Sequence, residues 1–270
     1  AVKASFFSDV ANLDVVYTPR FDPDRYIDGE DISYFNPRIG RLAGDDDPFP
    51  VEKRDDWFTD DEIAARISRN TGGFDAALYG YHGFWKSPMG FDSVSEKATF
   101  PALSVYGVSL RCNMLKCVGS MEAGYYDSRE DRLGGNPLIP NSQARFLAGY
   151  EQEIVTDLTV GGQYYIEHTT DYAAYRATLP DSMTPADKDR HILTLRLTWL
   201  VLHQDLRLTC FAFYSPTDKD AYLRPAAYYR IDDHWAASVG ANLFMGESEH
   251  TFFGQFEDTA NAYASLRYGF

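Results

Sequence analysis

The sequence predicts an all-β fold, an antiparallel transmembrane β-barrel, and three observations support this prediction. From about residue 100 onward, segments of roughly ten residues alternate apolar and polar side chains with a period of two. The connections between these segments alternate between short and long. The chain ends on an alternating aromatic segment, YASLRYGF, at residues 263–270. Short periplasmic turns, long extracellular loops and alternating strands are typical of outer-membrane barrels.

Composition excludes two other classes of protein. The 270 residues carry a formal net charge of −15, whereas a nucleic-acid-binding protein needs clustered Lys and Arg to neutralise phosphates. No segment approaches the roughly 18 consecutive apolar residues of a transmembrane helix. The longest candidate, residues 193–202, is interrupted by Thr194, Arg196 and Thr198. We therefore expect neither a nucleic-acid partner nor a helical membrane protein.

The predicted strands of the C-terminal half each have one apolar face and one mixed polar face. They occupy residues 157–168, 193–201, 206–214, 221–229, 235–243 and 262–270. Residues 59–70 are ambiguous, because Thr59 and Glu62 have the spacing of a helix capping box. The chain must nevertheless cross the membrane here to reach the next turn. We therefore predict a strand at 63–68 with Ile63, Ala65 and Ile67 facing outward.

Alternation alone would also suit a soluble β-sandwich, so the choice of a membrane barrel depends on two further features. Aromatic residues gather near the strand ends, as in the girdles of transmembrane barrels: Tyr79, Tyr81, Trp85, Tyr125, Tyr126, Tyr164, Tyr165, Tyr228, Tyr229 and Trp235. Short turns are predicted near residues 71–73, 113–116, 154–156, 203–205 and 231–234. Long loops are predicted at residues 20–61, 86–99, 128–142, 169–189 and 246–259.

Counting strands back from Phe270 gives roughly a dozen crossings to Asn12, preceded by a short strand at residues 1–8. An odd total is awkward, because single-chain bacterial barrels normally close with an even number of strands. The chain also begins at Ala1 without Met or a signal peptide, which indicates a processed end or a truncation. We therefore expect residues 1–270 to form a single barrel domain that is the C-terminal part of a larger barrel.

The C-terminal sixty or so residues resemble a known family. The segments FAFYSPTDKDAYLRPAAYYRIDDHWAASVGANLF and HTFFGQFEDTANAYASLRYGF are similar to the ends of porin-like and alginate-export-like outer-membrane proteins of Gram-negative bacteria. The resemblance implies a location in the bacterial outer membrane and contact with its lipid. It also implies that Tyr268 and Phe270 form a C-terminal signal for the barrel-assembly machinery.

Charged residues on the polar faces of the strands are the candidate pore-lining residues. An arginine facing lipid near the membrane midplane would cost about 2–4 kcal/mol, so these side chains should point inward. One interpretation is a set of ion pairs that stiffen the wall, and the other is a basic track that attracts anionic or polar solutes. The candidates are Arg66, Arg111, Arg145, Arg196, Arg207, Arg224, Arg267, Glu122, Glu151 and Glu167.

The loop at residues 21–61 is the largest insertion and is strongly acidic. Its segment DPDRYIDGED is dense in carboxylates, but the spacing is not that of an EF-hand, so we predict no metal site. Loops of this length are usually functional or disordered. We expect it to be solvated or to fold back over the pore, toward the arginines of the wall.

Catalysis and cofactor binding have little support in the sequence. The six histidines are scattered and no serine lies in a GxSxG setting, so we predict neither a catalytic site nor a cofactor. Cys112 and Cys117 flank a predicted turn and could form a disulfide or be small residues on a strand surface. The sequence predicts an outer-membrane channel or porin-like transporter for small polar or anionic solutes. The alternative is a scaffold barrel in an envelope complex, for example around an electron-transfer partner protein.

Overall fold

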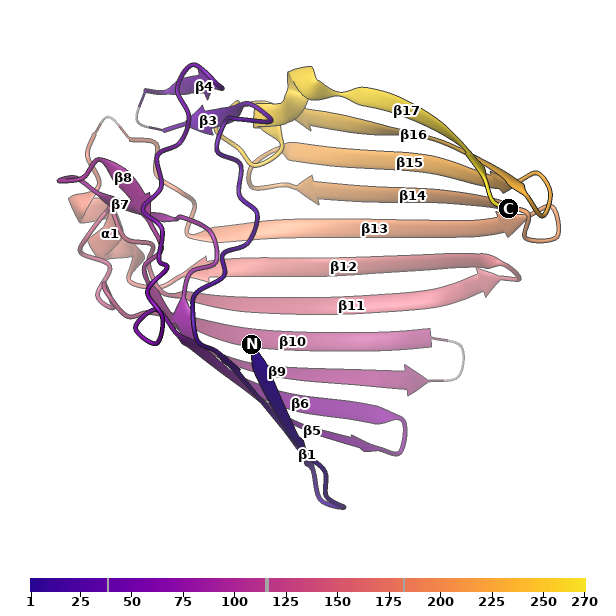
Figure 1. Ribbon diagram of the computed structural model, residues 1–270, viewed down its shortest axis with the longest axis horizontal. Coiled ribbons are helices and arrows are strands. Elements are labelled where there is room, and N and C mark those ends of the chain that lie inside the picture. The colour runs from indigo at the N-terminus through magenta and orange to yellow at the C-terminus, as the bar shows by residue number, and fades with distance from the viewer. Residues whose placement is uncertain (38, 115–116, 182) are drawn as a thin grey trace.

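One antiparallel sheet of 13 strands dominates the computed structural model, which describes residues 1–37, 39–114, 117–181 and 183–270. The strands lie side by side in chain order, and the sheet is strongly curved (Figure 1). They are β1 (Val2–Phe6), β2 (Asn12–Thr18), β5 (Glu62–Thr71), β6 (Phe74–Phe84), β9 (Ala102–Met114), β10 (Cys117–Ser128), β11 (Gln143–Val155), β12 (Leu158–Thr169), β13 (Asp189–Val201), β14 (Leu206–Ser215), β15 (Asp220–Arg230), β16 (Trp235–Gly246) and β17 (Asn261–Tyr268). The predicted dozen crossings from Asn12, with one strand before them, are confirmed.

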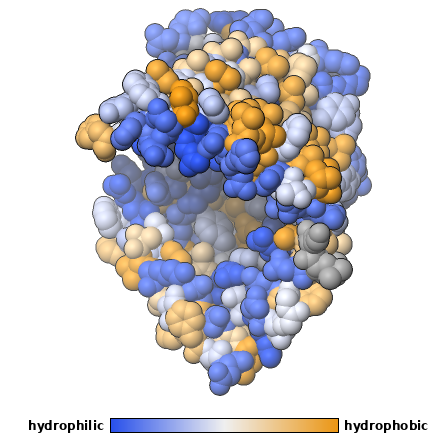
Figure 2. Space-filling view, turned by 90° about the vertical axis from the view of Figure 1, so that its right-hand side faces the viewer, coloured by the Kyte–Doolittle hydropathy of each residue, from blue (hydrophilic) through white to orange (hydrophobic). Residues whose placement is uncertain are grey.

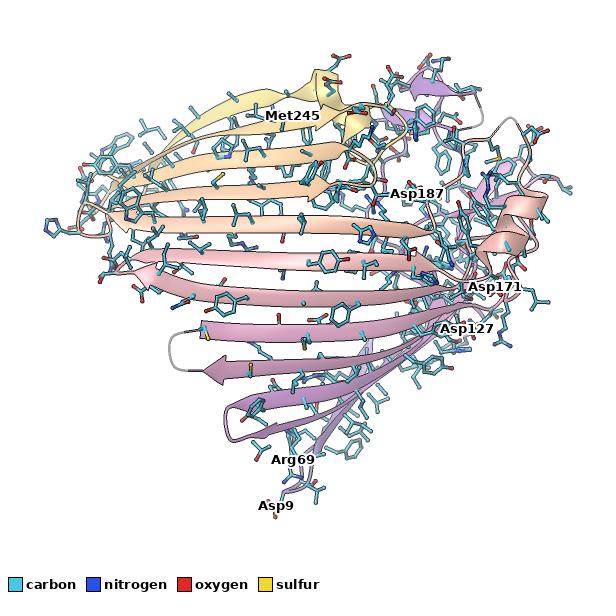
Figure 3. All side chains as sticks on the ribbon, turned by 180° about the vertical axis from the view of Figure 1, so that it is seen from behind. Asp9, Arg69, Asp127, Asp171, Asp187 and Met245 are labelled. Atoms are coloured by element: carbon cyan, nitrogen blue, oxygen red, sulfur yellow. The ribbon has the colours of Figure 1, made fainter. Side chains whose placement is uncertain are left out.

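The remaining elements belong to the long connections at one end of the sheet. Two small hairpins and two short helices decorate these loops: β3 (Tyr34–Asn36) with β4 (Arg41–Ala43), β7 (Gly90–Asp92) with β8 (Lys97–Thr99), α1 (Tyr172–Thr178) and η1 (Gly254–Thr259). Figure 3 shows Asp127, Asp171 and Asp187 at this long-loop end. Among the described residues, no helix is both long and apolar enough to cross a membrane.

The ambiguous segment at residues 59–70 contains a strand and not a helix, as predicted. β5 pairs along its length with β6, and Asn12 to Thr18 of β2 pair with its residues 62–68. Backbone pairing on both sides therefore overrides the local capping-box signal. Ile63 and Ile67 are both exposed on the same face of the strand, which agrees with the predicted outward direction.

Turn chemistry explains the short connections. Gly72 and Gly73 join β5 to β6 with φ of 58° and 85°, and two positive φ angles are what a tight type I′ hairpin turn requires. The alternation of short and long connections has one exception. The connection between β14 and β15 lies at the long-loop end but contains only residues 216–219. The predicted turn at 113–116 falls partly on residues 115–116, which lie outside the described residues.

The two faces of the sheet differ in chemistry. We call the face that carries Leu195 the outer face and the face that carries Arg196 the inner face. Large apolar side chains stand exposed on the outer face, for example Leu195 at 43%, Trp199 at 48% and Val239 at 54%. No other layer of the described chain covers them. An extended exposed apolar face indicates an apolar environment, because monomeric soluble proteins rarely expose a large contiguous apolar surface to water.

A compact hydrophobic core lies beneath the long loops and not within the sheet. Phe21, Phe84 and Phe100 are almost fully buried, and the ring of Phe21 lies 5.5 Å from that of Phe84 and 4.9 Å from that of Phe100. Tyr26 and Val51 pack against this cluster. The core thus fastens the first long loop onto the ends of β6 and β9.

The first long loop crosses the concave side of the sheet, and we call residues 19–61 the mouth strap. Near its ends it bonds to the β6–β9 connection, where the Glu52 amide donates to the carbonyl of Ala98 at 2.8 Å. Its β3–β4 hairpin lies beside η1, in the β16–β17 connection at the opposite side of the sheet. Figure 1 shows this indigo segment passing from one side to the other. At the sheet edges, β1 and β17 each pair with one neighbour and run in the same direction.

Candidate pore lining

The strand register places all ten predicted pore-lining residues on the inner face. In an antiparallel sheet, directly paired residues point to the same side, so the pairs can be followed from strand to strand. One such row joins Glu151, Gly161, Arg196, Phe211 and Arg224. The remaining candidates lie in rows of the same parity.

Five of the candidates surround one hollow in the middle of the wall, of about 490 Å³. Arg66, Arg111 and Arg196 contribute guanidinium groups, and Glu122 and Glu151 contribute carboxylates. These side chains come from five different strands, which the curvature of the sheet brings around one hollow. Figure 2, seen from the short-turn end, shows a hollow running into the molecule between hydrophilic surfaces.

A second hollow, of about 730 Å³, is lined by Arg196, Arg207 and Arg224. Within the described chain, none of these three guanidinium groups makes an ion pair or a hydrogen bond. Arg207 lies over the ring of Tyr228, with 5.3 Å between its guanidinium carbon and the ring centroid. This part of the wall therefore carries unneutralised positive charge, as the basic-track interpretation requires.

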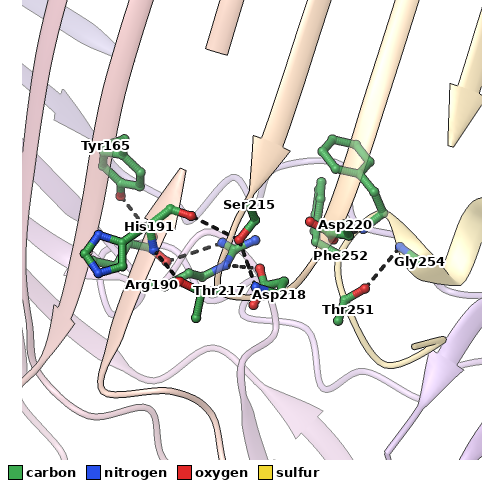
Figure 4. Close-up of polar contacts among 12 residues, drawn as sticks. Tyr165, Arg190, His191, Ser215, Thr217, Asp218, Asp220, Thr251, Phe252 and Gly254 are labelled. Carbon is green, nitrogen blue, oxygen red and sulfur yellow. Dashed lines mark hydrogen bonds and ion pairs between the residues drawn. The ribbon is translucent and has the colours of Figure 1, made fainter. Parts of the chain in front are cut away.

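Nearer the long loops, the arginines of the inner face are paired instead. Glu167 lies 3.5 Å from Nε of Arg145 and 3.4 Å from a terminal nitrogen of Arg190, and Arg190 Nε donates to Asp218 at 2.5 Å (Figure 4). Arg145 also stacks over the ring of Tyr126 at 4.0 Å. We call Arg145, Glu167, Arg190 and Asp218 the ion-pair ladder. At this level of the wall the charged residues form ion pairs, as the first interpretation expects, whereas attraction of solutes by the unpaired arginines stays a prediction.

Polar contacts hold the tight β14–β15 connection against its neighbours. The Ser215 hydroxyl donates to the carbonyl of His191 at 3.0 Å and accepts from the amide of Asp218 at 3.1 Å. The amide of Phe253 donates to the buried carboxylate of Asp220 at 2.7 Å. Figure 4 shows Ser215 between His191 and Asp218, with Asp220 to one side. They keep Asp218 in position to complete the ion-pair ladder.

A third hollow, of about 770 Å³, opens between the loops above the ladder. Its walls include Phe35 of the mouth strap, Arg190, and Gln255 of η1. Lys219 and Glu247 form an exposed ion pair of 2.9 Å at its edge, and this carboxylate raises the pKa of Lys219. The lysine therefore stays charged across the physiological pH range.

The last strand carries the remaining predicted residues. Arg267 pairs in register with Ala236, on the inner face near the short turns. The Tyr268 ring packs on the opposite face against Trp235, with 4.9 Å between ring centroids. Phe270 is fully exposed beyond the end of β17. The role of Tyr268 and Phe270 in assembly stays a prediction.

The mouth strap lies over the mouth, as one of the two expectations had it, but its carboxylates do not meet the arginines of the wall. Among the described residues, the strap's ion pairs use its own basic residues. Asp60 pairs with Arg54 at 3.2 Å and Asp46 with Arg41 at 3.6 Å. Arg54 also reaches Glu130 of the β10–β11 connection at 3.7 Å. Among the described residues, no ion pair therefore joins a strap carboxylate to an arginine of the wall.

Metal and thiol chemistry find no further support. In the described part of the chain, no three or more His, Cys, Asp or Glu side chains form a group that could hold a metal ion. No disulfide joins Cys112, Cys117 or Cys210. For Cys112 and Cys117 the structure thus agrees with the interpretation as small strand residues.

Sequence reasoning missed Arg190 and Asp218, two of the four members of the ion-pair ladder. Arg190 has the same parity as Arg196 on β13, so the alternation contains the signal that would have found it. Asp218 lies in the short β14–β15 connection, where no periodicity exists. Only the fold brings its carboxylate to Arg190.

The architecture described above is that of the porins. The chain superposes on a porin refined at 1.8 Å resolution with a TM-score of 0.54, covering 99% of this chain and 80% of that chain at 11% identity. A mutant of the Rh. blastica porin gives a TM-score of 0.44 at 12% identity, with 98% and 75% coverage. The KdgM porin in complex with disordered oligogalacturonate gives 0.33 at 11% identity, with 78% and 92% coverage. No protein-family model and no curated protein sequence matches the chain. The chain therefore has a porin-like β-barrel fold, as the sequence predicted.

Proposed function

We propose that residues 1–270 form one domain, the wall of an outer-membrane channel that passes small polar and anionic solutes. The observation that carries this proposal is the contrast between the faces of the sheet. The outer face exposes apolar side chains such as Leu195, and the inner face carries the unpaired Arg196, Arg207 and Arg224. A sheet with this polarity separates lipid from a polar interior.

The three unpaired arginines favour anions over cations. Fixed charges act over about 8–10 Å at physiological salt, which is comparable to the width of a narrow lumen. The acidic mouth strap acts in the opposite sense, but its carboxylates lie in solvent or are paired with Arg41 and Arg54. The arginines therefore dominate the field at the hollow that Arg196, Arg207 and Arg224 share, which has no acidic lining residue in the described chain.

The proposal also implies how the protein reaches and occupies its membrane. The outer face would contact outer-membrane lipid, and the aromatic end of β17, with Tyr268 and Phe270, would be read by the barrel-assembly machinery. Trp235 and Tyr268 pack together on the outer face at the short-turn end, where an aromatic girdle would meet the lipid headgroups.

Reconstitution into a planar lipid bilayer tests the channel directly. Wild-type protein should produce stepwise conductance, and a salt gradient should give a reversal potential of the sign expected for anion preference. A correctly folded protein that inserts into the bilayer but conducts nothing would overturn the proposal.

The alternative function, a scaffold barrel around a partner protein, is favoured by one observation. The mouth strap reaches from the β6–β9 connection to the β16–β17 connection and so narrows access to the lumen. Purification from native membranes without overexpression separates the two functions. A scaffold should co-purify with an envelope protein in fixed ratio, for example an electron carrier, whereas a channel should not need one.

A further inference from the structure

We propose that the hollow at Arg196, Arg207 and Arg224 is a binding subsite for aromatic carboxylates. This inference rests on the proposed channel function, because it names the class of anion that the wall would select. Its basis is the combination, in one hollow, of unpaired guanidinium groups with aromatic rings.

The positive side of the subsite consists of arginines that have no charged partner among the described residues. Arg196 and Arg224 lie in the same cross-strand row, one on each side of Phe211. Neither makes an ion pair or hydrogen bond among the described residues, so both guanidinium forks are free. A carboxylate is the planar, bidentate group that such a fork binds best.

The apolar side of the subsite consists of three aromatic rings. Phe211 stands between the two arginines, and its ring centroid lies 6.3 Å from that of Tyr222. Tyr263 lies flat against β16 at Gly240, where a Cβ atom would come within 2.5 Å of the tyrosine ring. Gly240 thus makes room for this ring at the edge of the hollow.

The geometry of the row decides which anions fit. Directly paired residues on one face have Cβ atoms about 4.5–5.5 Å apart, so Phe211 is within reach of a solute held by either arginine. A flat apolar ring attached to a carboxylate could meet the rings of Phe211 and Tyr263 while its charge meets a guanidinium group. Inorganic phosphate or an aliphatic acid would use only the charged side.

Nearby hydroxyl groups add a polar fringe to the same hollow. Thr198, Thr209 and Ser238 line it. The Thr209 hydroxyl already donates to the carbonyl of Ala226 and the Ser238 hydroxyl bonds to that of Ser265, but each oxygen can still accept a hydrogen bond from a ring substituent such as a hydroxyl group. Arg207 is held over the Tyr228 ring at 5.3 Å, which fixes the third positive charge at the margin.

Calorimetry on the detergent-solubilised chain tests this inference independently of conductance. Benzoate and cyclohexanecarboxylate have the same charge and nearly the same size, but only benzoate is flat and aromatic. We expect benzoate to bind about tenfold more tightly. The double variant Arg196→Gln and Arg224→Gln should lose binding of both acids, and Phe211→Leu should lose only the preference for benzoate.

Two matched controls separate the subsite from general effects of substitution. Arg69→Gln removes a positive charge from the outer face of β5, and Phe146→Leu removes an exposed ring from the outer face of β11. Both controls should bind benzoate as the wild type does. Loss of binding in either control would overturn the assignment of the site.

The remaining outcomes distinguish this inference from the proposed function. Equal binding of the two acids, or binding of inorganic phosphate in preference to both, would overturn the aromatic subsite. Absence of binding in a protein that conducts anions would overturn the subsite and leave the channel standing. Selective benzoate binding by a protein that conducts nothing would support the subsite and overturn the channel.

Discussion

The amide of Phe35 donates a hydrogen bond of 2.9 Å to the side-chain oxygen of Gln255, and this bond joins the first long loop to the last. The Phe35 ring also lies edge-on to His250, at 6.1 Å between centroids. Phe35 and Gln255 are separated by 220 positions in the sequence. Since Phe35 belongs to the β3–β4 hairpin, these contacts hold the far side of the mouth strap in place.

Gln255→Ala should loosen the mouth strap and raise single-channel conductance or the frequency of large openings. The side-chain hydrogen bond contributes about 0.5–1.5 kcal/mol, enough to change the population of a released strap several-fold. Deleting residues 28–56 should raise conductance further. Single-channel recordings in planar bilayers measure both effects.

Gln204→Ala is the matched control for the strap variants. Gln204 bonds to Asp157 at 3.0 Å, but at the short-turn end of the sheet, away from the mouth. Its conductance should equal that of the wild type. Unchanged conductance after deletion of residues 28–56 would show that the strap is a surface feature and does not limit the opening.

Glu167→Gln should destabilise the barrel, because it leaves Arg145 and Arg190 facing a neutral side chain. The three side chains are 19–28% exposed, so solvent screens the loss only partly. We expect a loss of about 1–3 kcal/mol in the free energy of unfolding. The temperature at which the folded band disappears in semi-native gel electrophoresis measures it.

The comparison variant for the ladder is Glu151→Gln. Glu151 lies on the same face of β11 and has no ion-pair or hydrogen-bond partner among the described side chains, so its variant should melt close to the wild type. If Glu151→Gln and Glu167→Gln lower the melting temperature equally, the ladder contributes nothing specific.

Periodicity explains why the strands and faces could be predicted from the sequence. In a sheet with lipid on one side and polar space on the other, apolar and polar side chains alternate with a period of two residues. The alternation of Leu195 and Arg196 in β13 therefore predicts which side chains of that strand face lipid. The same alternation predicted the outward face of β5, after the turn at Gly72 had shown that the chain must cross the membrane at this segment. Local signals alone, such as Thr59 with Glu62, pointed to a helix.

The loops could not be predicted because their order depends on contacts between distant segments. Nothing near Phe35 in the sequence indicates that it meets Gln255, and the burial of Phe21 depends on Phe84 and Phe100. Pairing among the charged residues was unpredictable for a similar reason. Arg145 is paired because the strand register sets it beside Glu167, and Arg190 is paired also because a short loop brings Asp218 to it.

Cysteine labelling in native membranes should map the two faces of the sheet. After Cys112, Cys117 and Cys210 are replaced by Ser, single cysteines are introduced and treated with a membrane-impermeant thiol reagent. Positions on the inner face, Arg196, Arg207 and Arg224, should react because water reaches them. Positions on the outer face should not react: Leu195, Leu197, Trp199, Leu206, Leu208 and Val239. Labelling of the outer set without the inner set would contradict the orientation.

Replacing Arg196, Arg207 and Arg224 together with Gln should shift the reversal potential in a salt gradient toward cation preference. These guanidinium groups are unpaired and share one hollow, so removing three positive charges changes the local field with no compensating loss of an ion pair. Arg224→Gln alone should give part of the shift, whereas Arg69→Gln, which removes the same charge from the outer face, should give none. A triple variant that folds and keeps the wild-type reversal potential would show that selectivity is set elsewhere, at the mouth strap or at the paired residues of the ladder.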